Sequence, residues 1–162
     1  MNSVIKIEIT QHRDVSNERL EQVLRLKMQH WNYSLDEHFR WILTNINSDD
    51  YHLVITNQNK ELIAYLNMVK ISVLINKKNK EFLGIGNVCV DNQYKGKGYG
   101  LLIMSVVNLF LREMKASGIL ICKTELEAFY KKAGWNRYGG EAFVRRRSEE
   151  RRVGKECRSR WS

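Results

Sequence analysis

Three glycines stand within five residues of one another, directly after an apolar run and directly before an amphipathic one. The segment reads Val88-Cys89-Val90-Asp91-Asn92-Gln93-Tyr94-Lys95-Gly96-Lys97-Gly98-Tyr99-Gly100. A helix that begins here leaves backbone N–H groups unpaired at its positive end, and the two lysines of the turn add positive charge. Because glycine has no side chain, the backbone can approach a bulky anion closely. The sequence therefore predicts a phosphate-binding turn.

The net charge of the chain is +9, and much of it lies at the C-terminus. Residues 147–162 match the translation of a common sequencing adapter at every position, so we expect 1–146 to be the one native domain and 147–162 to be a non-native tail. The native C-terminus would then be missing. The tail holds six basic and three acidic residues, which leaves +6 on residues 1–146. That charge suits a polyanionic cofactor, and no Lys/Arg stripe with interleaved aromatics indicates a nucleic-acid partner.

Other compositional features narrow the class of protein. The chain contains no run of about eighteen apolar residues, so no membrane span is expected, and its N-terminus lacks the apolar core of a secretion signal. Its three cysteines, Cys89, Cys122 and Cys157, show no metal-ligand spacing and no disulfide framework. We therefore expect a cytoplasmic protein of 162 residues without a metal site.

Hydrophobic periodicity predicts a strand over 4–10 and then two helices. The first helix is capped at Ser16 or Asn17, and its apolar face holds Leu20, Val23, Leu24 and Met28. The second begins at Ser34 with a capping box, and its predicted buried stripe is Leu35, Phe39, Ile42, Leu43 and Ile46.

Three strands over 51–56, 61–75 and 81–90 follow as an antiparallel meander. The helix after the glycine turn should bury Ile103, Val106, Val107, Phe110 and Met114 and stop at Gly118. A strand over 119–122, parallel to 81–90, a helix over 125–133 ending at Gly134 and a strand over 135–144 complete the chain. The order β-α-α-β-β-β-α-β-α-β predicts one mixed α/β domain, with a mostly antiparallel central sheet flanked by helices.

Two segments of the chain resemble the GNAT superfamily of N-acetyltransferases. Asn87–Gly100 is similar to that family's strand, turn and helix, whose loop reads Arg or Gln, two residues, Gly, one residue, then Gly or Ala. Gln93–Gly98 matches this loop by residue type, whereas Lys95–Gly100 matches it by distance from Val90. We prefer the second register, in which Lys95 replaces the usual Arg or Gln.

The second segment is Leu126–Trp135, which resembles the family's Phe-Tyr-x-x-x-Gly-Phe/Trp motif through Phe129, Tyr130, Gly134 and Trp135. Tyr130 lies 30 residues beyond Gly100, which leaves room for one helix and one strand. The resemblance covers nearly all of residues 1–146, and the family's last strand would be missing.

The resemblance implies acetyl-CoA as co-substrate, bound where the strands over 81–90 and 119–122 splay apart. It implies that the backbone of Val88, Cys89 and Val90 pairs with the acetyl group and the pantetheine arm. The pyrophosphate would lie on the turn made by Lys95, Gly96, Lys97, Gly98, Tyr99 and Gly100. No metal is implied.

Tyr130 is the candidate general acid, since a phenol with a pKa near 10 can give its proton to a thiolate whose conjugate acid has a pKa near 8.5. The alternative is a buried tyrosine that packs beside Phe129. For Cys89 we favour packing over a nucleophilic role. His30, Trp31 and Tyr33 form either part of an acceptor pocket or a core-edge aromatic cluster. The sequence offers four candidates for the general base, Glu81, Glu125, Glu127 and His52, and selects none of them.

The predicted function is acetyl transfer from acetyl-CoA directly to a primary amine, with a small-molecule acceptor modestly favoured. A protein amine as acceptor and a non-catalytic acetyl-CoA sensor of the same fold are the alternatives, and a homodimer is compatible with the resemblance.

Overall fold

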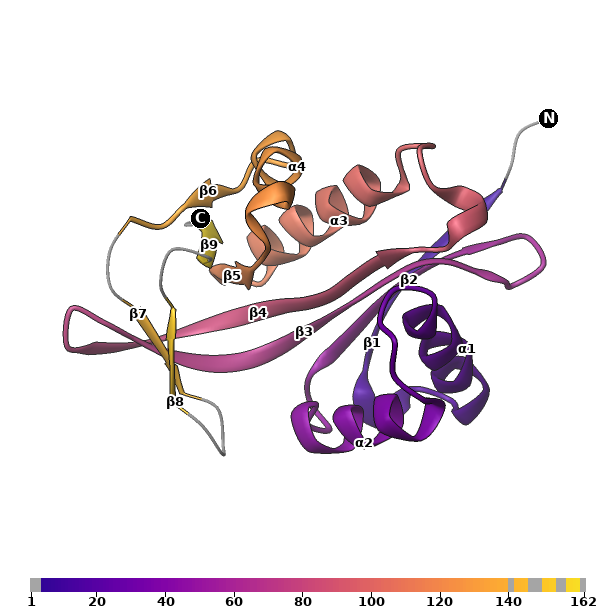
Figure 1. Cartoon of the computed structure of the whole chain (residues 1–162), viewed down its shortest axis with the longest axis horizontal. Coiled ribbons are helices and arrows are strands. Elements are labelled where there is room, and N and C mark those ends of the chain that lie inside the picture. The colour runs from indigo at the N-terminus through magenta and orange to yellow at the C-terminus, as the bar shows by residue number, and fades with distance from the viewer. Residues whose placement is uncertain (1–3, 140–141, 146–149, 154–156, 161–162) are drawn as a thin grey trace. The chain divides into compact units, whose positions relative to one another are not determined.

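The computed structural model describes residues 4–139, 142–145, 150–153 and 157–160 (Figure 1). The chain forms two compact units, one of Met1–Val69 and Asn87–Ile103, the other of Lys70–Gly86 and Met104–Ser162. The helices are α1 (Asn17–Met28), α2 (Leu35–Asn45), α3 (Tyr99–Glu113) and α4 (Glu127–Lys132), with 3-10 turns at His12–Asp14, Asn92–Tyr94 and Thr124–Leu126. The strands are β1 (Ile5–Gln11), β2 (Tyr51–Asn57), β3 (Leu62–Ile75), β4 (Lys78–Val90), β5 (Gly118–Ile121), β6 (Asn136–Arg137), β7 (Ala142–Arg145), β8 (Glu150–Val153) and β9 (Cys157–Arg160).

Both N-terminal helices begin where the sequence predicts. The Ser16 Oγ accepts a hydrogen bond from the Arg19 N–H at 3.1 Å, which caps α1. The Ser34 N–H donates to the Glu37 carboxylate at 2.7 Å while the Glu37 N–H donates to Ser34 Oγ at 3.2 Å. The predicted capping box of α2 is therefore confirmed.

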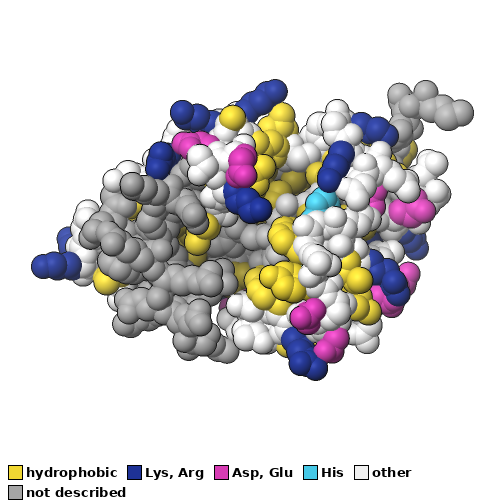
Figure 2. All heavy atoms as spheres, in the orientation of Figure 1, with side chains coloured by type: hydrophobic (Ala, Val, Ile, Leu, Met, Phe, Trp, Pro, Cys, Tyr) yellow, Lys and Arg dark blue, Asp and Glu magenta, His cyan; other side chains and the backbone are white. Residues whose placement is uncertain are grey.

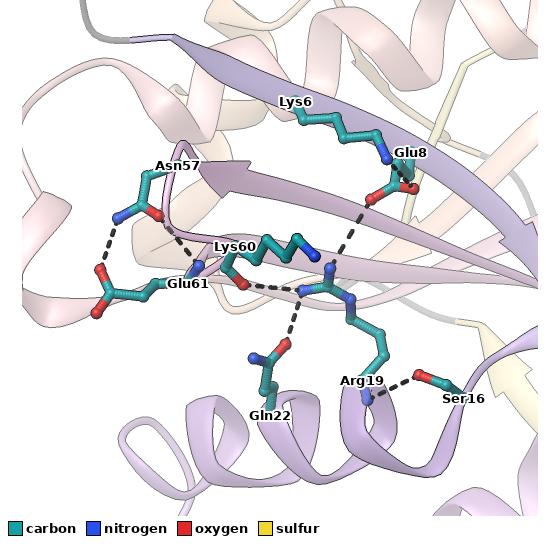
Figure 3. Close-up of polar contacts among 8 residues, drawn as sticks. All are labelled: Lys6, Glu8, Ser16, Arg19, Gln22, Asn57, Lys60 and Glu61. Atoms are coloured by element: carbon teal, nitrogen blue, oxygen red, sulfur yellow. Dashed lines mark hydrogen bonds and ion pairs between the residues drawn. The ribbon is translucent and has the colours of Figure 1, made fainter.

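Arg19 ties α1 to the strands of the first unit (Figure 3). Its guanidinium donates to Gln22 Oε1 at 2.7 Å on its own helix and to the Lys60 carbonyl at 3.5 Å in the turn after β2. It also lies 3.8 Å from the Glu8 carboxylate on β1. These contacts join α1 to strand β1 and to the turn between β2 and β3, so they help to fix the orientation of α1.

The core of the first unit lies between α1 and the strands. One cluster consists of buried side chains from α1, β2, β3 and β4, namely Val23, Leu26, Val54, Leu62, Tyr65 and Cys89. A second joins the two helices, which pack side by side in Figure 1, through Leu24, Ile42 and Ile46. α1 contributes side chains to both clusters and so links α2 to the sheet.

The predicted stripe of α2 is correct in part. Ile42 and Ile46 are buried, whereas Leu35, Phe39 and Leu43 are exposed. The buried residues are instead His38, Ile42 and Ile46, which are spaced four apart. Leu35, Phe39 and Leu43 form a neighbouring row with the same spacing, but only the first row packs against the rest of the protein.

The strand pairing confirms the predicted mixed sheet, whose order is β1-β2-β3-β4-β5-β9-β6. β1 pairs antiparallel with β2, and β2 pairs antiparallel with β3. β4 and β5 are parallel, as predicted, over Leu83↔Gly118 to Ile85↔Leu120.

The expected strand over 135–144 is instead two strands, β6 and β7. β7 pairs with β3 and with β8, and β9, which falls within the predicted tail, pairs antiparallel with β5 and β6. A strand from the predicted tail thus lies beside β5. The non-native origin of residues 147–162 stays a prediction.

In the second unit, α3 ends earlier than predicted. Lys115 adopts a left-handed conformation (φ 49°), and the Ala116 N–H donates to the Leu111 carbonyl at 2.9 Å, which closes the helix as a Schellman motif. The prediction that Gly118 stops the helix is wrong, because Gly118 is the first residue of β5. A Cβ there would lie 2.6 Å from the Trp135 ring and 2.7 Å from Leu111, so glycine is required by packing.

The buried face of α3 also differs from the predicted one. Ile103 and Val107 are buried as expected, but Met114 is exposed, while Met104 and Leu111 are buried. The apolar residues of this helix extend around more of its circumference than one stripe, so periodicity alone does not choose the buried face.

Candidate functional site

The backbone of β4 is irregular at one residue shortly before its end. Asn87 has a φ of 54°, a left-handed conformation that asparagine tolerates better than most residues. Its amide donates to Asn67 Oδ1 at 2.6 Å. The pairing of β4 with β5 ends at Ile85, two residues earlier. The backbone of β4 is therefore irregular directly before Val88–Val90, the residues predicted to bind the acetyl donor.

The glycine turn has the backbone that the sequence predicts. Gly96 (φ 74°) and Gly98 (φ 85°) are both left-handed, and a Cβ at either would meet no atom within 4 Å. Glycine is needed there for its conformation and not for space. The Gly98 carbonyl accepts from the Leu102 N–H at 3.0 Å, so α3 begins directly after it. The turn thus leads into a helix N-terminus, with Lys95 and Lys97 exposed beside it.

The end of α1 holds the segment between β4 and the glycine turn. The Gln29 amide donates to the Asp91 carboxylate at 2.8 Å and accepts from the Asn92 N–H at 2.9 Å. His30 Nε2 lies 2.8 Å from the Val90 carbonyl, so this nitrogen carries the proton and donates. Burial lowers the pKa of His30, which favours the neutral ring. His30 therefore supports the end of β4.

A pocket of about 480 Å³ lies within the first unit. Its lining includes the predicted Trp31 and Tyr33, together with residues that the sequence analysis did not select, namely Lys27, Glu37, His38, Trp41 and Asn87. Ligand pockets of this size commonly pair aromatic walls with a few polar groups. The acceptor-pocket interpretation of Trp31 and Tyr33 stays a prediction, and Trp31 also packs against the buried cluster of α1 and the sheet. His30 is not part of this lining.

Lys27 is the most unusual residue of the pocket. Its side chain is only 2% exposed, and its Nζ lies 4.3 Å from the centroid of the Trp41 ring. Burial lowers the pKa of its ammonium to about 8, so the group is still charged at neutral pH. Among the residues that the structure describes, no carboxylate lies within 4.0 Å of it.

The sequence did contain a signal for this lysine. Lys27 follows Leu20, Val23 and Leu24 at helical spacing, so it occupies a position of the apolar face where another apolar residue is expected. Met28, which is predicted to lie on this face, is exposed.

Comparison with known proteins decides the family. The profile of the acetyltransferase (GNAT) domain family matches residues 11–138. The chain belongs to the GNAT family. It is therefore an N-acetyltransferase domain, and the predicted resemblance is confirmed.

Solved structures share the GNAT fold at low identity. Escherichia coli ElaA is 17% identical with a TM-score of 0.69, and the alignment covers 98% of this chain and 100% of ElaA. An acyl-CoA N-acyltransferase from Pseudomonas aeruginosa is 18% identical, with a TM-score of 0.64 and coverage of 82% and 88%. Glucosamine-6-phosphate N-acetyltransferase from Arabidopsis thaliana is 19% identical, with a TM-score of 0.60 and coverage of 83% and 94%. No curated protein sequence matches the chain significantly.

In this GNAT domain Cys89 is a packing residue of the first unit. Its thiol is buried in the α1–sheet cluster, and burial raises its pKa to about 12. The thiolate is therefore not formed at neutral pH, which argues against a nucleophile. The predicted role of its backbone in binding the acetyl donor stays a prediction.

Tyr130 lies in the second unit, on α4. Its buried ring packs edge-on against Phe129 with centroids 5.0 Å apart, and its carbonyl accepts from the Trp135 N–H at 2.9 Å. Asn108 connects α4 to α3, because it donates to the Ala133 carbonyl at 2.9 Å and accepts from Trp135 Nε1 at 3.1 Å. These contacts position the Tyr130 helix, while the catalytic role of Tyr130 stays a prediction.

Of the four candidates for the general base, His52 has a hydrogen-bond partner at each of its ring nitrogens. It is buried between His12, at 2.9 Å, and the Tyr65 hydroxyl, at 2.7 Å. Burial lowers its pKa to about 4, so it is neutral at physiological pH. His52 is thus a hydrogen-bonded histidine of the core. Glu81 is exposed on β4.

Two further findings concern the described residues alone. Within 4–139 and the described strands beyond it, no helix is long and apolar enough to cross a membrane, and no three His, Cys, Asp or Glu side chains group as metal ligands. On the face shown in Figure 2, basic and acidic side chains are interspersed, so the positive charge of that face is not gathered into one stripe.

Proposed function

We propose that this GNAT domain transfers an acetyl group from acetyl-CoA directly to the primary amine of a small molecule. One observation carries the proposal: Asn87 lines the 480 Å³ pocket and directly precedes Val88–Val90 on β4. A pocket for the acceptor therefore adjoins the backbone segment that is predicted to hold the acetyl group.

The residues of the first unit fit acetyl-CoA. The left-handed Gly96 and Gly98 turn the chain into the N-terminus of α3, where backbone N–H groups favour an anion such as a pyrophosphate. Lys95 and Lys97 add exposed charges that can reach phosphate oxygens. Val88, Cys89 and Val90 would offer backbone groups to the pantetheine arm, and the bound thioester would supply the acetyl group.

Tyr130 is proposed to donate its hydroxyl proton to the departing thiolate. A phenol suits this task, because its ordinary pKa of about 10 lies near that of a thiol, at about 8.5. The acceptor amine must reach the reaction in its neutral form, and no described residue is assigned as its base.

The pocket favours a small acceptor over a protein amine. Its volume of about 480 Å³ and its walls of Trp31, Tyr33 and Trp41 suit a compact molecule. A non-catalytic sensor of the same fold would bind acetyl-CoA without transferring the acetyl group.

The experiment is calorimetry of the whole chain with acetyl-CoA, followed by a panel of amines with release of free thiol as readout. We expect saturable binding and amine-dependent thiol release. Tyr130→Phe should lower kcat by about a hundredfold without weakening acetyl-CoA binding, whereas Tyr138→Phe serves as the matched control.

The outcomes separate the alternatives. Absence of acetyl-CoA binding would refute the proposal. Binding without turnover of any amine would favour the sensor. Turnover that is unchanged in Tyr130→Phe would remove the assigned general acid.

A further inference from the structure

The pocket contains a buried positive charge that the fold itself does not need. A lysine placed in a core normally pairs with a carboxylate, because an isolated buried charge is unfavourable. Lys27 instead ends in the pocket with an aromatic ring, Trp41, 4.3 Å from its Nζ. This cation–π contact stabilises the ammonium on one side, and the N–H groups of the ammonium remain available to donate hydrogen bonds to a ligand.

The other ionisable groups of the pocket do not neutralise Lys27. The Glu37 carboxylate is exposed, accepts from the Ser34 N–H at 2.7 Å and belongs to the α2 capping box. His38 Nε2 lies 3.3 Å from the Trp31 carbonyl, to which it donates. Burial lowers the pKa of His38, so it is neutral above its ordinary pKa. At neutral pH the pocket thus presents one buried cation, without a described counter-charge within 4.0 Å.

We infer that Lys27 is a subsite for an anionic group of the acceptor, so that the preferred acceptor is an amine that also carries a carboxylate or a phosphate. The inference rests on the proposed function, because it names the acceptor of the same pocket. An anion beside Lys27 would receive charge-assisted hydrogen bonds in a site poor in water, where such bonds are strongest. Trp31, Tyr33 and Trp41 would contact the apolar or ring portion of the same molecule.

The test compares amines that differ only in their anionic group. One pair is phenylalanine and phenethylamine, which differ by a carboxylate, and the other is glucosamine 6-phosphate and glucosamine, which differ by a phosphate. Each amine is titrated onto the whole chain with CoA present, a condition without acetyl transfer, and binding is followed by calorimetry. Acetyl transfer is then measured separately by thiol release with acetyl-CoA.

We expect the anionic member of at least one pair to bind about ten- to a hundredfold more tightly than its neutral partner. The pair that shows the preference identifies the anion as carboxylate or phosphate. Lys27→Met should abolish that preference by weakening the anionic member about tenfold or more and should raise its KM with little change in kcat. Binding of the neutral member should change less than about twofold, since it makes no bond to the ammonium.

The control is Lys6→Met, which removes a lysine of the same unit whose side chain is 70% exposed. It should preserve the preference. If wild-type protein binds both members of both pairs equally, or if Lys27→Met keeps the preference, the inference is wrong. An equal fall in kcat for neutral and anionic amines in Lys27→Met would also overturn it, because it would indicate a role in the chemical step. Failure of acetyl transfer to every amine would instead refute the proposed function, while the titrations would still decide the role of Lys27.

Discussion

Replacing Lys27 by methionine removes the buried ammonium of α1 and keeps an unbranched side chain of similar length. Folding lowers the pKa of Lys27 from 10.5 to about 8 because burial removes water from the charged group. At about 1.4 kcal/mol per pH unit, this fall corresponds to about 3 kcal/mol of lost stability at pH 7. The contact with Trp41 offsets about 1 kcal/mol of it. We therefore expect Lys27→Met to raise the free energy of unfolding by about 2 kcal/mol at pH 7.

The pH dependence of this difference gives the sharper measurement. Between pH 8 and 10.5 the native protein has released the Lys27 proton while the unfolded chain still binds it, so wild-type stability rises with pH through this window. The advantage of the variant should shrink accordingly. Cys89 acts in the opposite direction, because burial raises its pKa from 9.0 to about 12, but it is present in both proteins.

The assay is urea unfolding of wild type, Lys27→Met and the exposed-site control Lys6→Met at several pH values from 7 to 10. The control should follow the wild type at every pH. Two results would show that the buried Lys27 ammonium does not lower stability as predicted. One is a Lys27→Met variant less stable than wild type at pH 7, and the other is a difference in stability that does not change with pH. Either would mean that the ammonium is not desolvated in the native pocket.

Three further predictions concern other residues. Gly98→Ala should lower the unfolding free energy by about 1 kcal/mol, since φ is 85° there, and should weaken acetyl-CoA binding. Gly139→Ala should have neither effect. Urea unfolding measures the stability, and calorimetry measures the binding. Gly118→Ala should lower the unfolding free energy by about 1–3 kcal/mol, because its Cβ would lie 2.6 Å from Trp135, and an unchanged melting temperature would contradict this packing. The wild type should lose about 3 kcal/mol of unfolding free energy as pH falls from 6.5 to 4, because in this range only the unfolded chain protonates His52. In His52→Gln this contribution to the loss of stability in acid should be absent from the unfolding curves.

Local features of the chain were predictable because they depend on neighbours in sequence. The Ser34 capping box and the left-handed glycines of the turn involve residues only a few positions apart. The order of the elements and the parallel pairing of β4 with β5 followed from periodicity and the length of the connecting helix. The buried faces of α2 and α3 were less predictable, because each helix has more apolar residues than one contact surface can cover, as exposed Phe39 and Met114 illustrate.

The GNAT architecture and the turn proposed to bind phosphate follow from the residues alone, since each rests on short-range backbone preferences and on the order of motifs along the chain. The residues that face the proposed acceptor pocket depend on how distant segments pack. Lys27 becomes a buried charge because α2 brings Trp41 over it, and Asn87, in a left-handed conformation on β4, lines the same pocket. Burial and desolvation arise from contacts between distant segments, so neither the chemistry of Lys27 nor its proposed anionic ligand could be inferred from periodicity alone.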